Sequence, residues 1–244
     1  MEPTWLTAFV DLAPEAHPGG AAFWRAATGS QLSASRGAQD EFATLLPPTG
    51  DPWLRVQRVA SQSGTHVDLH VADLDTAVAD ALAAGARLVA RPGHVVLRSP
   101  GGYPFCLVTS RLSALPEPVA WPDGHLSRVD QLCLDIPAAD YDAEVAFWHD
   151  LTGWPTTPNT TLTEFTRLET PPTVALRILL QRIGEGTIGG HLDVATTDPP
   201  AEIARLQGLG ARVVGDGRGW TVLASPVGTA LCVTEREPVT GRGR

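Results

Sequence analysis

Two short stretches of the chain alternate polar and apolar residues in the same way, at residues 66–70 and 191–194. Such alternation, with a period of two, is typical of a β-strand whose two faces meet different surroundings. The pattern therefore predicts two strands with a polar pair on one face. Each pair is a histidine and an aspartate, namely His66 with Asp68 and His191 with Asp193.

Hydrophobic spacing also predicts the other elements of the N-terminal half. A helical period predicts helices over residues 21–27 and 76–84, each ended by a glycine. Asp73 or Asp75 can cap the second helix. Short apolar runs between Gly- and Pro-rich turns predict the strands. These strands cover residues 5–12, 40–46, 53–59, 66–71, 87–90, 95–98 and 105–109.

A long internal repeat relates the two halves of the chain. The pair Phe23-Trp24 returns as Phe147-Trp148 after 124 residues, and the His-x-Asp motif returns after 125 residues. The Gly-Ala-Arg motif after the second helix, a Ser-Pro turn and a cysteine in the last strand return as well. Each half reads as a βαβββ unit followed by a second one. The sequence thus predicts an α+β protein made of four such modules.

The repeat is too long for a solenoid unit, so it indicates a duplicated domain. Residues 112–125 lie between the halves and contain three prolines and an Asp-Gly step, which mark a linker. We therefore expect a first domain at residues 1–111 and a second at 126–237. A Gly- and Arg-rich tail at residues 238–244 should be flexible.

Composition excludes several classes of function. The 244 residues carry a net charge of −9, and the chain contains no lysine. A negative protein lacks the basic face that binds nucleic acids or anionic membranes, so we expect neither partner. The absence of lysine excludes a Schiff-base lysine and a Lys-dependent phosphate loop.

Cysteine content and hydropathy indicate the cellular compartment in which the protein is expected. Three cysteines without a Cys-x-x-Cys pair do not make a disulfide framework, which favours a reducing cytoplasm. The first residues do not resemble a signal peptide, and no apolar stretch approaches the roughly 18 residues of a membrane helix. We expect a cytoplasmic protein that is a monomer or a homodimer.

The order of these motifs resembles that of the vicinal oxygen chelate (VOC) superfamily, which contains glyoxalase I, bleomycin-resistance proteins and extradiol dioxygenases. The chain is most similar to the glyoxalase-like branch common in actinobacteria. The matching motifs are Phe-Trp, His-x-Asp, Gly-Ala-Arg and Ser-Pro-x-Gly…Cys, each found twice in the same order. The resemblance implies that pairs of modules form two eight-stranded cups whose interiors hold a ligand.

Metal-dependent members of the superfamily hold a divalent ion with residues of the first and last strands, usually His and Glu. The resemblance places the family's histidine at His66 and His191. Its last-strand glutamate falls on Cys106 and Cys232 instead. Buried cysteines in apolar strands are usually small, inert core residues.

The superfamily's first-strand ligand falls near Leu6 or Thr7 in one half and near Asp130 or Gln131 in the other. His70 shares a face with the first histidine, but residues i and i+4 of a strand lie about 13 Å apart. One histidine and one cysteine are fewer than the three protein ligands of a catalytic metal site. We therefore expect no metal and no other cofactor, with a divalent metal as the alternative.

The repeated His-x-Asp pairs are the main ligand-binding candidates. They can orient a ligand on the polar floor of an apolar cup, or they can simply fix strand register as buried, satisfied groups. His66 and His191 are also candidate general bases, although the two side chains of each pair must lean together, because Cα atoms at i and i+2 lie about 7 Å apart. Two glutamines recur within strands. The predicted ligand-binding set is His66, Asp68, Gln57, His191, Asp193 and Gln181.

Three classes of function remain open from the sequence. The first hypothesis is a protein that binds a small organic molecule in a β-cup without a catalytic metal. The second is a VOC enzyme, either a metal-dependent lyase or dioxygenase, or a cofactor-free isomerase that uses His66 or His191. The third is a structural or interaction module in which one cup is filled by side chains. The sequence leaves open the identity of the ligand and whether each cup forms within one chain.

Overall fold

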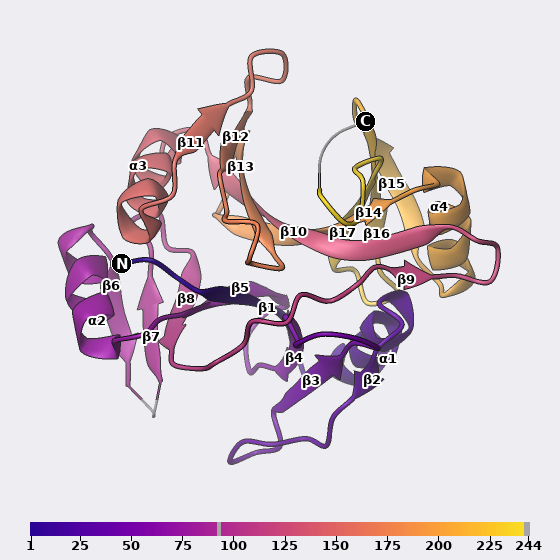
Figure 1. Ribbon diagram of the computed structural model, residues 1–244, viewed down its shortest axis with the longest axis horizontal. Coiled ribbons are helices and arrows are strands. Elements are labelled where there is room, and N and C mark those ends of the chain that lie inside the picture. Colours follow the sequence, from indigo (N-terminus) through magenta and orange to yellow (C-terminus); the bar gives the residue numbers. More distant parts are fainter. Residues whose placement is uncertain (92–93, 242–244) are drawn as a thin grey trace. The chain divides into compact units, whose positions relative to one another are not determined.

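The computed structural model describes residues 1–91 and 94–241 and has the α+β architecture expected from the sequence. Residues 242–244 of the predicted tail lie outside the described part. The first half contains β1 (Trp5–Leu12), α1 (His17–Ala27), β2 (Gln31–Leu32), β3 (Phe42–Leu46), β4 (Leu54–Arg58), β5 (Gly64–His70), α2 (Leu74–Ala83), β6 (Arg87–Ala90), β7 (Val95–Arg98) and β8 (Pro104–Val108) (Figure 1).

The second half repeats this order after one additional short strand. It contains β9 (Val119–Ala120), β10 (Leu126–Pro137), α3 (Tyr141–Thr152), β11 (Thr156–Pro158), β12 (Phe165–Leu168), β13 (Arg177–Ile183), β14 (Gly189–Thr196), α4 (Pro199–Gly208), β15 (Arg212–Asp216), β16 (Trp220–Ala224) and β17 (Ala230–Thr234). The four βαβββ modules predicted from the repeat are therefore present.

Three local features refine the predicted elements. Helix α1 begins at His17 rather than at residue 21, because a proline in its first turn starts a helix without losing a hydrogen bond. Asp73, and not Asp75, caps α2, since its carboxylate accepts a bond of 2.7 Å from the backbone N–H of Thr76. Strand β9 lies inside the predicted linker and pairs with β10, so the second sheet has nine strands instead of the expected eight.

Two mixed sheets contain these strands. The order is β2-β3-β4-β1-β5-β8-β7-β6 in the first and β11-β12-β13-β10-β14-β17-β16-β15 in the second. In both sheets the strand with the His-x-Asp motif runs parallel to the last strand of its module. The register aligns Asp68 with Cys106 and Asp193 with Cys232. Strand pairing thus places a thiol beside each aspartate.

The chain forms two compact units that do not coincide with the two halves of the repeat. Unit 1 comprises residues 1–9, 65–113 and 132–190. Unit 2 comprises residues 10–64, 114–131 and the chain from residue 191 onward. Each unit therefore combines one module of the first half with one module of the second. The domain boundaries expected at residues 111 and 126 stay a prediction.

The core of unit 1 joins α3 to β8. The ring centroid of Phe105 lies 5.8 Å from that of Phe147 and 5.6 Å from that of Trp148. Glu144 on α3 is fully buried, and its carboxylate accepts bonds from the backbone N–H of Gly101 (2.6 Å) and from the Trp148 indole (2.9 Å). Burial raises the pKa of Glu144, and these hydrogen bonds oppose the rise.

Unit 2 has a different arrangement around its first helix. Gly20 of α1 approaches Leu12 so closely that an added Cβ would lie 2.7 Å from a Leu12 methyl carbon. Trp24 is buried on the same helix, and its indole nitrogen has no hydrogen-bond partner among the described residues. The repeat places Gly20 where the other half has Glu144, which explains why this indole lacks the acceptor that Trp148 has.

A buried ionic network ties the end of the predicted linker to α4 in unit 2. The ring nitrogen Nε2 of His125 lies 2.8 Å from the Glu202 carboxylate, which is itself inaccessible to solvent. Arg205 donates two bonds to Glu202, at 2.8 and 2.7 Å, and its guanidinium carbon lies 3.5 Å from the centroid of the Trp121 ring. Charges removed from water in this way are tolerated only when they are paired.

Candidate functional sites

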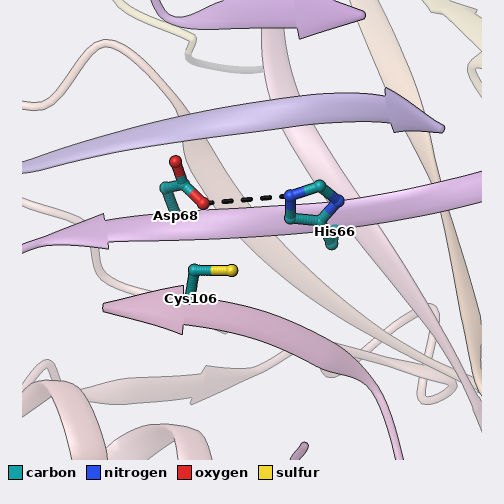
Figure 2. Close-up of side chains that lie close together, drawn as sticks. All are labelled: His66, Asp68 and Cys106. Atoms are coloured by element: carbon teal, nitrogen blue, oxygen red, sulfur yellow. Dashed lines mark ion pairs between the residues drawn. The ribbon is translucent and has the colours of Figure 1, made fainter. Parts of the chain in front are cut away.

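The first His-x-Asp pair forms a cluster with a cysteine in unit 1. His66 and Asp68 project from β5, and Cys106 projects from the neighbouring β8 (Figure 2). Nε2 of His66 lies 3.8 Å from Oδ1 of Asp68, and the potential donor atoms of all three residues lie within 4.8 Å of one another. The His66 and Asp68 side chains are only 11% and 5% exposed. The shared face predicted from the alternation is therefore present and largely buried.

The short distance shows that the His66 and Asp68 side chains lean toward each other. In a regular strand their Cα atoms lie about 7 Å apart, and Figure 2 shows the carboxylate turned along β5 toward the imidazole. Cys106 completes a set of three donor types: nitrogen, oxygen and sulfur. The ligand count made from the sequence included only histidine and cysteine and omitted Asp68.

His70 lies on the same strand but interacts elsewhere. Its Nε2 lies 2.8 Å from the hydroxyl of Thr7 on β1, and its Nδ1 contacts the hydroxyl of Ser110 after β8. Thr7, one of the two predicted first-strand ligand positions, is therefore engaged with His70. The other, Leu6, is a fully buried core residue.

Strand β1 instead brings an aromatic ring to the first cluster. Phe9 stacks on His66, with ring centroids 4.1 Å apart and an angle of 19° between the planes. One face of the imidazole is thus covered by a phenyl ring, which contributes apolar contact and no ligand atom. The first cluster is bounded by an apolar group on this side.

The second His-x-Asp pair forms the corresponding cluster in unit 2. His191 and Asp193 lie on β14, and Cys232 lies opposite Asp193 on β17. Nε2 of His191 is 3.4 Å from Oδ1 of Asp193, and the three potential donor atoms lie within 4.8 Å of one another. The His191 side chain is 12% exposed and that of Asp193 is 5% exposed.

Two polar side chains hold the other oxygen of Asp193. Gln131 of β10 donates a bond of 2.6 Å from its amide nitrogen to Oδ2, and a guanidinium nitrogen of Arg236 lies 3.5 Å from the same oxygen. Oδ1 has no hydrogen-bond partner among the described residues. Burial raises the pKa of Asp193, while the nearby charges of His191 and Arg236 oppose this rise.

Arg236 is fixed by a second buried carboxylate. Its Nη2 and Nε donate bonds of 2.6 and 3.2 Å to the two oxygens of Asp130, which is fully buried. Asp130 and Gln131 were noted in the sequence only as first-strand positions of the superfamily. Arg236 was missed, because the repeat places Ser110 at the equivalent point of the other half and offers no recurring signal.

The two predicted glutamines lie in the unit that does not contain the His-x-Asp pair of their own half. Gln57 belongs to unit 2 and His66 to unit 1, whereas Gln181 belongs to unit 1 and His191 to unit 2. Within unit 1, the Gln181 side-chain oxygen accepts a bond of 3.5 Å from the thiol of Cys133. A ligand-binding role for Gln57 and Gln181 stays a prediction.

Each cluster fits the donor requirements of a divalent metal ion. A catalytic zinc site uses three protein ligands, and two ligands of one such ion lie about 3–4 Å apart. The His–Asp distances of 3.8 and 3.4 Å match this spacing. Oδ1 of Asp193 is buried, lies 3.4 Å from Nε2 of His191 and accepts no hydrogen bond from the described residues, so it can still bind a cation. Imidazole and thiolate donors suit zinc and iron, while the carboxylate is compatible with both.

The model of one protein family matches both halves of the chain. It is described as a glyoxalase-like domain and covers residues 8–108 and 131–234. The chain belongs to this glyoxalase-like family. The family match, its repetition and the fold place the protein in the VOC superfamily, as the sequence motifs predicted.

Solved structures of other proteins share the fold of this glyoxalase-like protein. A Mn(II)-bound glyoxalase from Novosphingobium aromaticivorans is similar with a TM-score of 0.65 and 16% identity, over 100% of this chain and 87% of that one. The 2,2',3-trihydroxybiphenyl 1,2-dioxygenase of Sphingomonas wittichii strain RW1 gives 0.64 and 14%, over 93% and 88%. Identities this low establish a common fold and no common activity.

A third structure is longer than this chain. A xylose isomerase-like TIM barrel/4-hydroxyphenylpyruvate dioxygenase fusion protein is similar with a TM-score of 0.61 and 13% identity; the match covers 97% of this chain and 49% of the fusion protein. No curated protein matches the chain. Among the helices of the described residues, none has the length and apolar character needed to cross a membrane.

Proposed function

We propose that this glyoxalase-like protein is a metal-dependent enzyme that acts on a small organic molecule, with His191, Asp193 and Cys232 as its metal ligands. The observation that carries the proposal is the state of Asp193. One oxygen of this buried carboxylate is held by Gln131, while the other faces His191 and accepts no hydrogen bond within residues 1–91 and 94–241. A buried acceptor left unpaired costs about 1–3 kcal/mol, which a cation at this point would recover.

The protein side chains have separate tasks at such a site. A divalent ion, when bound, supplies Lewis acidity that polarises an oxygen of the organic ligand. His191 and Asp193 come from one strand and Cys232 from its parallel neighbour, so the sheet fixes the spacing of the three donors. Gln131 limits rotation of the Asp193 carboxylate and keeps Oδ1 directed at His191. The low exposure of these side chains restricts access of bulk water.

The family relationship supports a metal and a small organic ligand without identifying either. The related structures include a glyoxalase described as Mn(II)-bound and a dioxygenase named for a trihydroxybiphenyl. Both spread their similarity over almost the whole of this chain. An aromatic diol and a small carbonyl compound are therefore sensible first substrates. A cytoplasmic location and a monomeric or homodimeric state remain predictions.

Metal titration tests the proposal directly. Purified, reduced protein should bind Zn²⁺, Mn²⁺ or Fe²⁺ in competition with a chromogenic chelator, with a Kd below about 1 μM for the preferred ion; structural zinc sites are considerably tighter. Asp193→Asn should weaken binding at least about 100-fold, because the ion loses its only charged oxygen ligand. The exposed Asp142→Asn serves as a control that keeps the same change of charge.

Two results would contradict the metal site. One is a wild-type protein that binds none of these ions. The other is an Asp193→Asn protein that is folded by circular dichroism and binds them as tightly as the wild type. With metal bound, oxygen uptake in the presence of catechol and loss of a small carbonyl compound would separate a dioxygenase from a lyase.

A second candidate, metal-free binding of an organic molecule, is favoured by one feature of unit 1. There the Phe9 ring stacks on His66, so an apolar ring lies directly beside the polar pair of His66 and Asp68. Such a combination holds an organic ligand by shape and by one or two hydrogen bonds. Native mass spectrometry before and after treatment with EDTA separates the two candidates. A co-purified molecule that survives removal of metal supports direct binding, and its loss together with the metal argues against it.

A further inference from the structure

The two clusters share their three central residue types but differ at every position that supports the aspartate. The repeat aligns Gln131 with Thr7 and Asp130 with Leu6. It aligns Arg236, four residues after Cys232, with Ser110, four residues after Cys106. Unit 2 therefore has an amide, a carboxylate and a guanidinium where unit 1 has a hydroxyl, an alkyl chain and a second hydroxyl.

These supporting groups in unit 2 converge on one atom of Asp193. The Gln131 amide lies 2.6 Å from Oδ2 and the Arg236 guanidinium lies 3.5 Å from it. Arg236 is itself oriented by two bonds to Asp130, at 2.6 and 3.2 Å, in the two-pronged geometry that fixes a guanidinium plane. Oδ2 is thus held from two sides, and Oδ1 remains directed at His191.

The charges of Asp130, Asp193 and Arg236 also compensate one another. Asp130 and Asp193 are two carboxylates buried close together, and Arg236 is the guanidinium placed against both. A single buried charge is costly, whereas a cation shared between two carboxylates lowers that cost. Asp130 neutralises the Arg236 guanidinium, so the negative charge of Asp193 is still available to a divalent ion. Unit 1 has Leu6 and Ser110 at the places of Asp130 and Arg236.

We propose that Arg236 is a positioning residue that, together with Asp130 and Gln131, makes the cluster of unit 2 the tighter metal site of the chain. This inference rests on the proposed function. Arg236 contacts the ligand residue Asp193 and not the metal, so it acts through the orientation and charge of that carboxylate. The chain accordingly binds one divalent ion tightly, in unit 2, and the cluster of unit 1 binds one weakly or not at all.

Metal affinity and stoichiometry of the full chain test the inference. Competition titration with Zn²⁺ and Mn²⁺ should give one tight ion per chain, which Asp68→Asn retains and Asp193→Asn removes. Arg236→Gln should weaken this tight site about 10- to 100-fold, the usual effect of losing an outer partner of a metal ligand. Arg236→Lys should retain part of the affinity, because it keeps the charge without the two-pronged geometry. Ser110→Ala is the matched change in unit 1 and should leave the tight site unchanged.

A double variant keeps the test valid if Arg236→Gln fails to fold. Arg236→Gln leaves Asp130 buried without its cation, whereas Arg236→Gln with Asp130→Asn removes both charges and should restore folding. Folding is followed by circular dichroism and thermal unfolding without metal. A folded double variant with wild-type affinity would overturn the positioning role while the proposed metal site stands. Two equally tight ions per chain would also overturn it. A wild-type chain that binds no ion would overturn the proposed function and this inference with it.

Discussion

Unit 1 and unit 2 contain the same His-Asp-Cys cluster on equivalent strands, yet the groups around it have different chemistry. In unit 1 an aromatic ring stacks on His66, and Thr7 and Ser110 hold the neighbouring His70. In unit 2 an ionic set holds Asp193. The position of His70 in the strand is taken there by an alanine. A repeated motif therefore indicates a repeated location, and its neighbours decide what that location can do.

The same contrast extends to the helices of the two units. On α3 of unit 1, Glu144 accepts the indole N–H of Trp148. On α1 of unit 2, glycine occupies the equivalent position, and no acceptor for the indole N–H of Trp24 lies in the part of the chain that the structure describes. On α4 of unit 2, Glu202 pairs with His125 and Arg205, whereas the equivalent residue of α2 is Ala77. These two matched differences between helices can therefore be tested by substitution.

The largest effect on stability is expected at the buried network of unit 2. Glu202→Ala removes the carboxylate from between His125 and Arg205 and leaves the largely buried Arg205 guanidinium without this carboxylate partner. Breaking a buried pair from one side costs about 3–5 kcal/mol. Urea unfolding should show this loss, while the exposed Glu185→Ala should change stability by less than about 0.5 kcal/mol. A loss below about 1 kcal/mol for Glu202→Ala would mean that the network contributes little.

An intermediate effect is expected from the paired and unpaired indoles. Trp148→Phe removes a donor from the buried Glu144 carboxylate, whereas Trp24→Phe removes an N–H that has no partner. Both changes lose similar apolar contact, so their difference isolates the hydrogen bond. Trp148→Phe should cost about 1–3 kcal/mol more than Trp24→Phe in urea unfolding. Equal losses of stability would show that the hydrogen bond from Trp148 to Glu144 makes no net contribution to the free energy of unfolding.

The smallest effect is the pH dependence that Glu144 of unit 1 contributes. Burial raises the pKa of Glu144 in the folded state above its value in the unfolded chain, so the folded state binds the proton more tightly. The contribution of this group is therefore complete below the unfolded pKa and is lost as the pH rises through the folded pKa. Glu144→Gln should remove this part of the pH dependence of urea unfolding above about pH 4.5. An unchanged profile would contradict the assignment.

Most of the fold could be predicted because its signals are local or repeated. The alternation around residues 66–70 and 191–194 correctly predicted strands with His and Asp on one face. The glycine after each predicted helix correctly marked its end. The linker assignment missed β9, because two residues that pair only through tertiary contacts carry no hydrophobic period of their own.

The clusters were harder to predict than the strands that carry them. The ligand count from the sequence omitted Asp68 and Asp193, because regular strand geometry separates residues i and i+2. The sequence showed that the side chains must lean to meet, but not that they do. Arg236 had no signal at all, because it recurs nowhere and its partners lie more than 40 residues away along the chain. The sequence also did not predict which modules form each compact unit. The packing of α3 on β8 is a long-range contact and leaves no local sequence pattern.

The exchange of modules between the halves limits how the chain can be divided. The apolar surface of Phe105 belongs to the first copy of the duplication, and the rings that cover it, Phe147 and Trp148, belong to the second. A fragment ending before the proline-rich segment would expose this surface to water and be prone to aggregate. A single-copy ancestor would meet the same difficulty alone and would overcome it by associating with another molecule of itself. Joining the two copies in one chain makes this association intramolecular, so that it no longer depends on protein concentration.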